Sequence, residues 1–221
     1  MKKLVAEFLG TLLLVAAVVG SGIMAQQLAK DPALALICNT IATGGALVAI
    51  LHVFAPISGA HLNPAVSVLM VVRRELSPRL ALGYVLVQIA GAIAGAILAN
   101  AMFALDPLEL STTVRAGFPK LLSEGVATFG LIGVVLCVGR PFAVAAYIVA
   151  AYWFTASTSF ANPAVTIGRA FSDTYAGIRP ADIVGFVIAQ AIGAALGGIV
   201  FGWLRHVERA PVDDLVSDLE N

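Results

Sequence analysis

The stretch Leu62-Asn63-Pro64-Ala65-Val66-Ser67-Val68 recurs in the second half of the chain as Ala161-Asn162-Pro163-Ala164-Val165-Thr166-Ile167. Asn caps free backbone N–H groups at a helix start, and Pro fits the first helical turn without losing a hydrogen bond. Each copy therefore predicts the start of a helix. The apolar run that follows ends at Arg73-Arg74 in the first copy and at Ser172-Asp173 in the second, after about ten residues, or roughly 15 Å of helix. That is half of a bilayer, so we expect two half-length helices whose starts meet at the membrane midplane.

The composition is typical of a protein that crosses the membrane several times. Of the 221 residues, 60% are hydrophobic and 12% are charged, and the mean hydropathy is +0.96. Soluble domains carry about twice that charged fraction. The formal net charge is +0, which gives no indication of a nucleic-acid partner. Both cysteines, Cys38 and Cys137, lie in apolar runs, a setting more typical of buried thiols than of a disulfide or a metal site.

Six full-length apolar segments accompany the two half-length ones. They cover residues 4–28, 34–54, 78–103, 121–138, 142–157 and 181–204. Residues 55–62 form a polar-punctuated approach to the first half-helix, 106–120 form a loop, and a polar, finally acidic tail starts at Arg205. The predicted fold class is an all-α membrane protein, with six transmembrane helices and two re-entrant half-helices in a single channel-like domain over residues 1–221.

The two halves of the chain repeat each other. At one constant offset, Pro78, Gly83, Tyr84, Gln88, Gly91 and Gly95 are matched by Pro180, Gly185, Phe186, Gln190, Gly193 and Gly197. Glu7 and Thr11 likewise correspond to Glu124 and Thr128, at the same four-residue spacing and so on the same helix face. The repeats span about 1–105 and 119–206, leaving the tail 207–221. Because each half has an odd number of spans, we expect the halves to be inverted in the membrane, with half-helices entering from opposite faces.

The basic residues of the connecting segments predict the orientation. Eight of them fall on one side of the predicted topology and five on the other. The first group is Lys2, Lys3, Arg73, Arg74, Arg79, Arg140, Arg205 and Arg209; the second is Lys30, Arg115, Lys120, Arg169 and Arg179. We therefore expect both termini to be cytoplasmic, in a multi-pass protein of the cell's inner (plasma) membrane.

Two interrupted helices that meet at midplane imply a path for solutes. Non-helical backbone at this depth must be buried in protein or line a water-filled cavity. Each half-helix start carries roughly half a positive charge and free N–H donors, and the Asn amides offer further donors to the lumen. Cations and protons meet a repulsive field there, whereas neutral solutes do not. The chemistry therefore favours passage of water and small neutral solutes.

These motifs resemble those of the major intrinsic protein family, the aquaporins and aquaglyceroporins. The resemblance runs from Ala6-Glu7-Phe8-Leu9-Gly10-Thr11 through Ile57-Ser58-Gly59-Ala60-His61-Leu62-Asn63-Pro64-Ala65-Val66 to the second motif and the last span. It implies a right-handed bundle around one pore per subunit, a homotetramer, and passive flux without a cofactor. The implied pore motif residues are Asn63, Pro64, Ala65, Asn162, Pro163 and Ala164.

Three further polar residues have two interpretations each. Glu7 and Glu124 could couple transport to protons, but their symmetric placement favours a structural role as acceptors for the backbone donors of the half-helix loops, which the resemblance also implies. His61 either lends a carbonyl or imidazole to the pore wall or packs against its neighbours. The Gly91/Gly95 and Gly193/Gly197 pairs provide small residues for close helix contact.

The expected selectivity filter departs from the family pattern. Most members have Arg directly after the second Asn-Pro-Ala, where this chain has Val165; counting from the motifs gives Thr43, Ala150 and Ser159 as the other three members. Water-selective relatives use a bulky aromatic, a His and the Arg, and glycerol channels use aromatics with the Arg. The small, nearly neutral quartet here implies a wide filter or a simple loss of selectivity. The chain resembles the bacterial subgroup associated with arsenic resistance, which implies metalloid hydroxides or methylated arsenicals as solutes.

Arg169 lies one helical turn beyond Val165, about 6 Å farther outward. It could place a cation at the outer mouth, or its side chain could extend to the interface.

A secondary transporter is the rival function, because such proteins also use inverted repeats and broken helices. The sequence shows no intramembrane basic partner or second acid suited to ion coupling. It also shows no nucleophile–base–orienter set and no metal cluster, so no enzyme activity is predicted.

Overall fold

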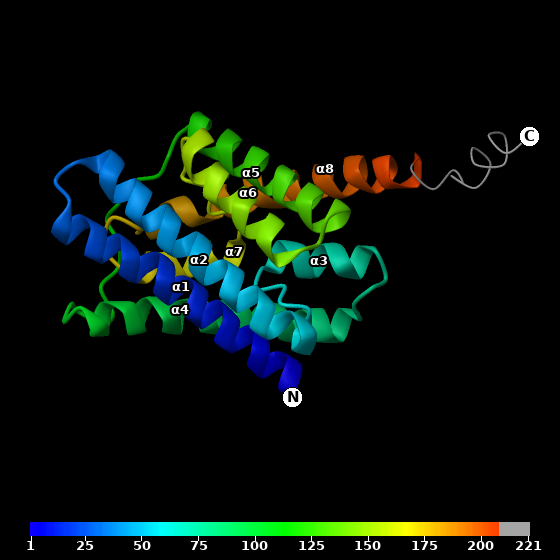
Figure 1. Cartoon of the computed structure of the whole chain (residues 1–221), viewed down its shortest axis with the longest axis horizontal. Coiled ribbons are helices and arrows are strands. Elements are labelled where there is room, and N and C mark those ends of the chain that lie inside the picture. Colours follow the sequence, from blue (N-terminus) through cyan, green and yellow to red (C-terminus); the bar gives the residue numbers. More distant parts are fainter. Residues whose placement is uncertain (208–221) are drawn as a thin grey trace, which may run out of the picture.

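A computed structural model describes residues 1–207, and this part of the chain is helical with no strand (Figure 1). The elements in chain order are α1 (Lys2–Leu28), α2 (Pro32–Ser58), α3 (Pro64–Val72), α4 (Pro78–Met102), α5 (Phe118–Cys137), α6 (Pro141–Phe154), α7 (Pro163–Gly168) and α8 (Ile183–Val207). Two 3-10 turns, η1 (Arg169–Phe171) and η2 (Pro180–Asp182), follow α7 and precede α8.

Local sequence signals set the helix starts. Helices α2 to α7 each have Pro in the first two positions, where its missing N–H costs no hydrogen bond. Asp31 caps α2 through Oδ1, which accepts from the backbone N–H groups of Ala33 and Leu34 at 2.7 and 3.2 Å. The Ser77 hydroxyl accepts from Leu80 N at 3.3 Å and caps α4 in the same way.

Several boundaries differ from the sequence prediction. Helix α2 continues through Pro56 to Ser58 and ends where Gly59 adopts φ 91°, so half of the predicted non-helical approach is helix. Helix α5 begins at Phe118, inside the predicted loop, and α6 ends at Phe154 rather than near 157. Helix α8 reaches Val207; the acidic part of the predicted tail lies outside the described residues.

Within residues 1–207, five helical segments are long and apolar enough to cross a membrane: α1, α2, α4, α5 and Pro180–Arg205, which covers η2 and most of α8. Helix α6 is the sixth predicted span. It is apolar but has only 14 residues, about 21 Å of helix. It is therefore shorter than the roughly 30 Å hydrocarbon core of a typical bilayer.

Glycines bring the main helix pairs into backbone contact. A Cβ atom on Gly91 or Gly95 of α4 would meet the carbonyl oxygens of Phe8 and Leu12 on α1. In the second half, a Cβ on Gly193 of α8 would meet the carbonyl oxygen of Gly125 on α5. Helices α1 and α4 thus cross as α5 and α8 do, and the sequence repeat is also a repeat of packing.

The two half-helices start close together in the middle of the bundle and run toward opposite ends (Figure 1). Helix α3 extends toward the end that holds the N-terminus, and α7 with η1 extends toward the α1–α2 connection. Helix α7 has six residues and is followed directly by the 3-10 turn η1. The second half-helix is therefore not one α-helix over the whole apolar run of about ten residues, as the sequence predicts.

Candidate functional site: a cavity between two half-helix starts

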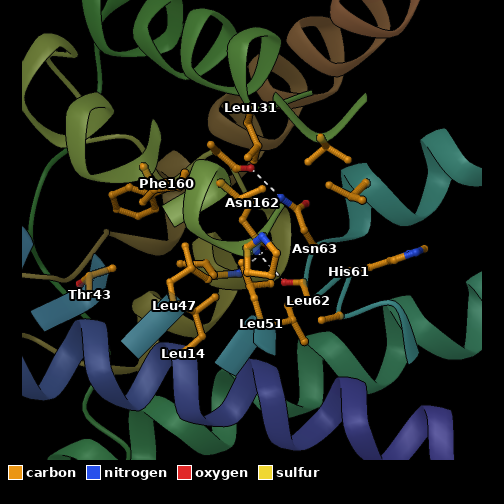
Figure 2. Close-up of a pocket in the computed structure, with 18 of the residues that line it drawn as sticks. Leu14, Thr43, Leu47, Leu51, His61, Leu62, Asn63, Leu131, Phe160 and Asn162 are labelled. Carbon is orange, nitrogen blue, oxygen red and sulfur yellow. Dashed lines mark hydrogen bonds between the residues drawn. The ribbon is translucent and has the colours of Figure 1, made fainter. Parts of the chain in front are cut away.

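The side-chain amides of Asn63 and Asn162 join the two half-helix starts. Asn63 Nδ2 donates to the carbonyl oxygen of Ala161 at 2.8 Å, and Asn162 Nδ2 donates to that of Leu62 at 2.7 Å. Each Asn therefore binds the residue that precedes the other motif (Figure 2). An amide nitrogen carries two N–H groups, so one donor of each Asn remains for the cavity that both residues line.

The amide oxygens of the same two residues cap their own helices. Asn63 Oδ1 accepts from Ala65 N at 2.9 Å, and Asn162 Oδ1 accepts from Ala164 N at 3.0 Å. One side chain thus stabilises its helix start and orients donors toward the other half. This double use of the amide explains why Asn, and not Ser or Asp, serves as the cap here.

The backbone before each motif bends through left-handed conformations. Leu62 has φ 49° and Ala161 has φ 46°, and Ala60 and Ser159 share the pattern two residues earlier, with φ 46° and 47°. Such conformations cost non-glycine residues on the order of 1–3 kcal/mol each, so the surrounding contacts must hold them. Sequence reasoning missed these bends, because Ala and Leu carry no turn signal.

Glu7 holds the first bend. Its Oε1 accepts from Ser58 Oγ at 2.6 Å and from His61 N at 2.9 Å, while Oε2 accepts from Leu62 N at 2.6 Å and from Gln88 Nε2 at 2.8 Å. The Glu7 side chain is fully buried in α1. Its carboxylate thus satisfies backbone donors that lie in the membrane interior.

Glu124 holds the second bend in the same way. Its oxygens accept from Phe160 N and Ala161 N, both at 2.9 Å, and from Gln190 Nε2 at 2.7 Å. Gln190 also donates to Thr166 Oγ1 at 2.9 Å, as Gln88 donates to Ser67 Oγ at 3.1 Å in the first half. The sequence repeat identified Gln88 and Gln190 as matched positions. Only the structure shows that they bind the Glu7 and Glu124 carboxylates.

A cavity of about 260 Å³ passes the junction of the half-helices. Figure 2 shows Asn63 and Asn162 in its middle, Thr43 and Phe160 toward one end, and His61 toward the other. Its walls are mainly apolar, with leucines from α1, α2 and α5 among them: Leu14, Leu47, Leu51 and Leu131. Polar groups are therefore confined to the motif side and to the ends of the cavity.

Three of the four predicted filter residues line the cavity, namely Thr43, Ser159 and Val165. Ala150 does not: it is exposed, and helix α6 instead presents Ile148 and Tyr152 to the cavity. These two residues are four positions apart and so share a helix face, whereas Ala150 lies about 200° around the helix from each. Counting residues from the motif gives a position along α6 but not which face of that helix points toward the cavity.

His61 lines the cavity at the end toward α3. Its Nδ1 lies 3.1 Å from Ser67 Oγ, and its ring packs edge-on against Tyr84 with centroids 5.3 Å apart. The His61 side chain thus packs against its neighbours and also lines the cavity, and its role in a pore stays a prediction.

Arg169 lines the cavity near Phe160. Its side chain is 2% exposed, its Nε donates to the carbonyl oxygen of Ala176, and its guanidinium carbon lies 3.4 Å from the centre of the Phe160 ring. The side chain therefore turns into the protein and does not extend to the membrane interface.

Arg115, in the α4–α5 connection, was used only to predict the orientation and was not predicted from the sequence as a site residue. It contacts the same Phe160 ring, at 4.9 Å from the centroid, and donates to three carbonyl oxygens: Gly177 at 2.6 Å, Tyr175 at 3.0 Å and Ser157 at 3.3 Å. Burial lowers the pKa of Arg115 from its usual value. A single Arg in a polar loop carries no local signal for such a position.

Comparisons with known proteins agree with this geometry. Residues 1–142 match the profile of the family described as "Major intrinsic protein". The aquaglyceroporin AqpS of Rhizobium meliloti is 54% identical over 214 residues, covering 94% of this chain and 92% of its own. Glycerol uptake facilitator protein-like 6 of Lactiplantibacillus plantarum is 33% identical over 142 residues, or 62% of each chain.

The fold also has a solved counterpart. The X-ray structure of the aquaglyceroporin from Plasmodium falciparum superimposes with a TM-score of 0.73, covering 97% of this chain and 98% of that one at 20% identity. With a family match over more than half of the chain and a relative 54% identical along most of it, the chain belongs to the major intrinsic protein family of membrane channels.

Proposed function

We propose that this passive channel conducts water, glycerol-sized solutes and larger uncharged molecules, with metalloid hydroxides or methylated arsenicals as the favoured large solutes. The observation that carries the proposal is the cavity between the half-helix starts, where Asn63 and Asn162 line an otherwise largely apolar wall. The printed name of the Rhizobium meliloti relative, an aquaglyceroporin, supports the glycerol-sized class.

The electrostatics of the junction between the half-helix starts favour the passage of uncharged solutes over that of cations. The positive ends of α3 and α7 meet where each Asn amide binds the carbonyl before the other motif, so a cation in the cavity faces two helix dipoles. A neutral hydroxylated solute can instead accept from the remaining Asn donors. Passage then needs neither an energy source nor a conformational cycle.

The outer part of the cavity supports solutes larger than water. Val165, directly after the second motif, places a short apolar side chain in the cavity wall, next to the small residues Thr43 and Ser159. Tyr152 and Phe160 supply aromatic surface nearby. We propose Thr43, Ser159 and Val165 as filter residues, and Ile148 or Tyr152 for the position first assigned to Ala150.

Three further properties belong to the same proposal. The basic-residue asymmetry supports cytoplasmic termini in the inner (plasma) membrane. Large apolar side chains exposed on the outer surfaces of the transmembrane helices suit contact with lipid or with other subunits. We propose a homotetramer, in which each chain surrounds its own cavity.

Stopped-flow light scattering on proteoliposomes tests this function directly. We expect permeabilities above those of protein-free vesicles for water, glycerol, urea and neutral arsenous acid. Solute concentrations should equalise across the membrane and go no further. Accumulation driven uphill by a proton or sodium gradient would instead establish the secondary transporter.

A substitution at Val165 tests the filter. Val165→Arg adds a long, charged side chain where the wall is now apolar, so glycerol and arsenous acid flux should fall much more than water flux. Val165→Thr is the matched control, because it nearly keeps the shape and should leave the ratios almost unchanged. Equal proportional losses for water and large solutes would show that position 165 does not select by size.

A further inference from the structure

The residues that helix α6 presents to the cavity depend on the rotation of this helix about its own axis. Successive helix residues lie about 100° apart, so a turn by one residue would replace Ile148 in the wall. Helix α6 has 14 residues, and its far side, with Phe142, Ala146 and Ala150, is exposed. Its rotation is therefore set where it packs against its neighbours α5 and α2.

Tyr147 joins α6 to α5. Its ring lies over Gly130, because a Cβ atom added to that glycine would be 2.6 Å from the ring carbon Cζ and 2.9 Å from Cε2. The Tyr147 hydroxyl donates to the carbonyl oxygen of Ala127 at 3.0 Å, and that of Val126 is 3.4 Å away. The missing side chain of Gly130 thus makes room for a ring whose hydroxyl binds the backbone of α5.

Val149 packs against α2 on the other flank of α6. A Cβ atom on Gly44 of α2 would meet the Val149 side chain, with the Val149 Cβ 3.9 Å away. Tyr147 and Val149 are about 200° apart around the helix, and Ile148 lies between them, about 100° from each. The gaps at Gly130 and Gly44 therefore receive the side chains on the two sides of Ile148.

Alanines flank Ile148 on the surface of α6. Ala145 and Ala151 are three positions before and after it, so each lies about 60° from Ile148 around the axis, one on either side. Both alanines are buried. Turning α6 in either direction would thus bring a methyl group toward the wall in place of the larger Ile148 side chain, and the cavity would widen.

We propose that Tyr147 is a positioning residue for the pore wall, because its bond to the Ala127 carbonyl holds α6 at the rotation that presents Ile148 to the cavity. The inference rests on the proposed pore function and adds a determinant of solute size that lies outside the cavity lining. Val144 and Tyr152 share the face of Ile148, four residues to either side, and line the cavity with it. The rotation held by Tyr147 therefore affects three wall residues at once.

Removing the hydroxyl alone should release this rotation without detaching the helix. In Tyr147→Phe the ring still packs against α5, while the bond to Ala127 is lost. The chain just after α6 stays tied to α5, because the Ala156 N–H donates to Ser123 Oγ at 3.0 Å. One lost neutral hydrogen bond shifts the balance between two helix orientations by about two- to tenfold. Ile148 should then leave the wall in part of the molecules.

The first test measures solute size selectivity of the full chain in proteoliposomes by stopped-flow light scattering. We expect Tyr147→Phe to raise the glycerol-to-water permeability ratio by roughly twofold or more, because the wall loses Ile148 part of the time. Phe142→Leu is the matched control, since it also changes an aromatic residue of α6 but on the exposed side, and it should leave the ratio unchanged.

The second test follows the rotation itself by thiol labelling, in a chain that carries Cys38→Ser and Cys137→Ser. Ile148→Cys should react faster with a small water-soluble thiol reagent than Ala151→Cys does, because Ile148 lines the cavity and Ala151 is buried. Adding Tyr147→Phe should slow the reaction at position 148 and speed it at position 151. A merely structural loosening would speed both.

Gly130→Ala reaches the same contact from α5 and keeps the test decisive if Tyr147→Phe folds poorly. Its added methyl group occupies the space of the Tyr147 ring, so the ring must move and both ratios should change in the same direction as in Tyr147→Phe. Gly45→Ala is the control, because a Cβ atom there meets nothing within 4 Å.

The outcomes separate this inference from the proposed function. A wild-type protein that conducts no solute above protein-free vesicles would overturn the pore function itself. If wild type conducts glycerol while Tyr147→Phe and Gly130→Ala leave the labelling ratio or the permeability ratio at the wild-type value, the positioning role is overturned and the pore remains. Equal acceleration of labelling at positions 148 and 151 would overturn it as well.

Discussion

The carboxylates of Glu7 and Glu124 hold the two backbone bends from which the half-helices start. Each accepts two backbone N–H groups and the amide of a glutamine from a neighbouring helix. Because donors occupy their oxygens, we propose that these carboxylates serve as structural anchors. A proton-carrying role would require this hydrogen-bond set to break in every cycle.

Replacing either carboxylate should therefore destabilise the protein. Glu7→Ala or Glu124→Ala leaves several buried donors unpaired, at about 1–3 kcal/mol each, so yield and thermal stability in detergent should fall. Glu75→Ala is the control, because Glu75 forms an exposed pair with Arg73, and such pairs contribute little. A stable Glu7→Ala protein that had merely lost a pH-dependent flux would favour proton coupling.

The two candidate positions on α6 can be separated by adding the same ring to each. Ile148→Phe places extra volume in the cavity and should reduce glycerol flux more than water flux, whereas Ala150→Phe adds it on the exposed face and should have little effect. Both fluxes are measured by stopped-flow light scattering. If Ala150→Phe narrowed the pore and Ile148→Phe did not, the position obtained by counting from the motif would be the better one.

Some residues of the site were predictable from the sequence and others were not. Asn63, Asn162 and Glu7 stand out because a repeat preserves them at matched positions and few polar groups are tolerated in the membrane. Arg115 and the bends at Leu62 and Ala161 depend on contacts between distant segments. No local pattern of residue types encodes such contacts.

At the scale of elements, the glycines of α4 and α8 decide how closely the helices of each half can pack. Gly95 lies against the backbone of α1, and Gly193 lies against that of α5. Side chains at these points would separate the helices that carry Glu7 and Glu124 from those that carry Gln88 and Gln190. The glycine spacing therefore also maintains the geometry of the two carboxylate clusters.

Adding one methyl group at these glycines tests that dependence. Gly95→Ala and Gly193→Ala force backbone atoms apart, so we expect losses of about 1–3 kcal/mol and lower melting temperatures in detergent. Gly45→Ala and Gly202→Ala are matched controls, since an added Cβ at either position meets nothing within 4 Å. If the controls were destabilised equally, the loss would not come from helix contact.

The sequence predicted the existence and order of the helices more accurately than their ends. Apolar runs, polar cap residues and Pro in the first turn are local features, so α2, α4 and both half-helices begin within two residues of the predicted positions. The ends depend on packing: α2 continues through Pro56 to Ser58, and α7 gives way to the turn η1. Residues at these ends are equally hydrophobic whether they are helical or not, so an apolar run does not show where its helix ends.

At the scale of the whole molecule, the paired half-helix starts should exclude protons even though Val165 supplies no charge. The dipoles of α3 and α7 and the Asn63–Asn162 junction remain, so proton conductance should stay far below water permeability. Proteoliposomes loaded with a pH-sensitive dye and given a pH gradient measure this, with protein-free vesicles as control. A proton flux comparable to the water flux would contradict a barrier at the junction.

The hydrogen bonds from each Asn amide to the residue before the other motif also constrain how the chain can be made. The acceptor of the Asn63 amide lies 98 positions further along the sequence, and a ribosome adds about 5–20 residues per second, so the partner arrives roughly 5–20 s later. Glu7 can already bind the bend before α3. The Asn63 amide still lacks the Ala161 carbonyl, and the Leu62 carbonyl still lacks the Asn162 amide. Nascent chains that stop short of Asn162 should therefore leave the first half-helix at the membrane surface, where an added protease can cleave it, until translation supplies its partner.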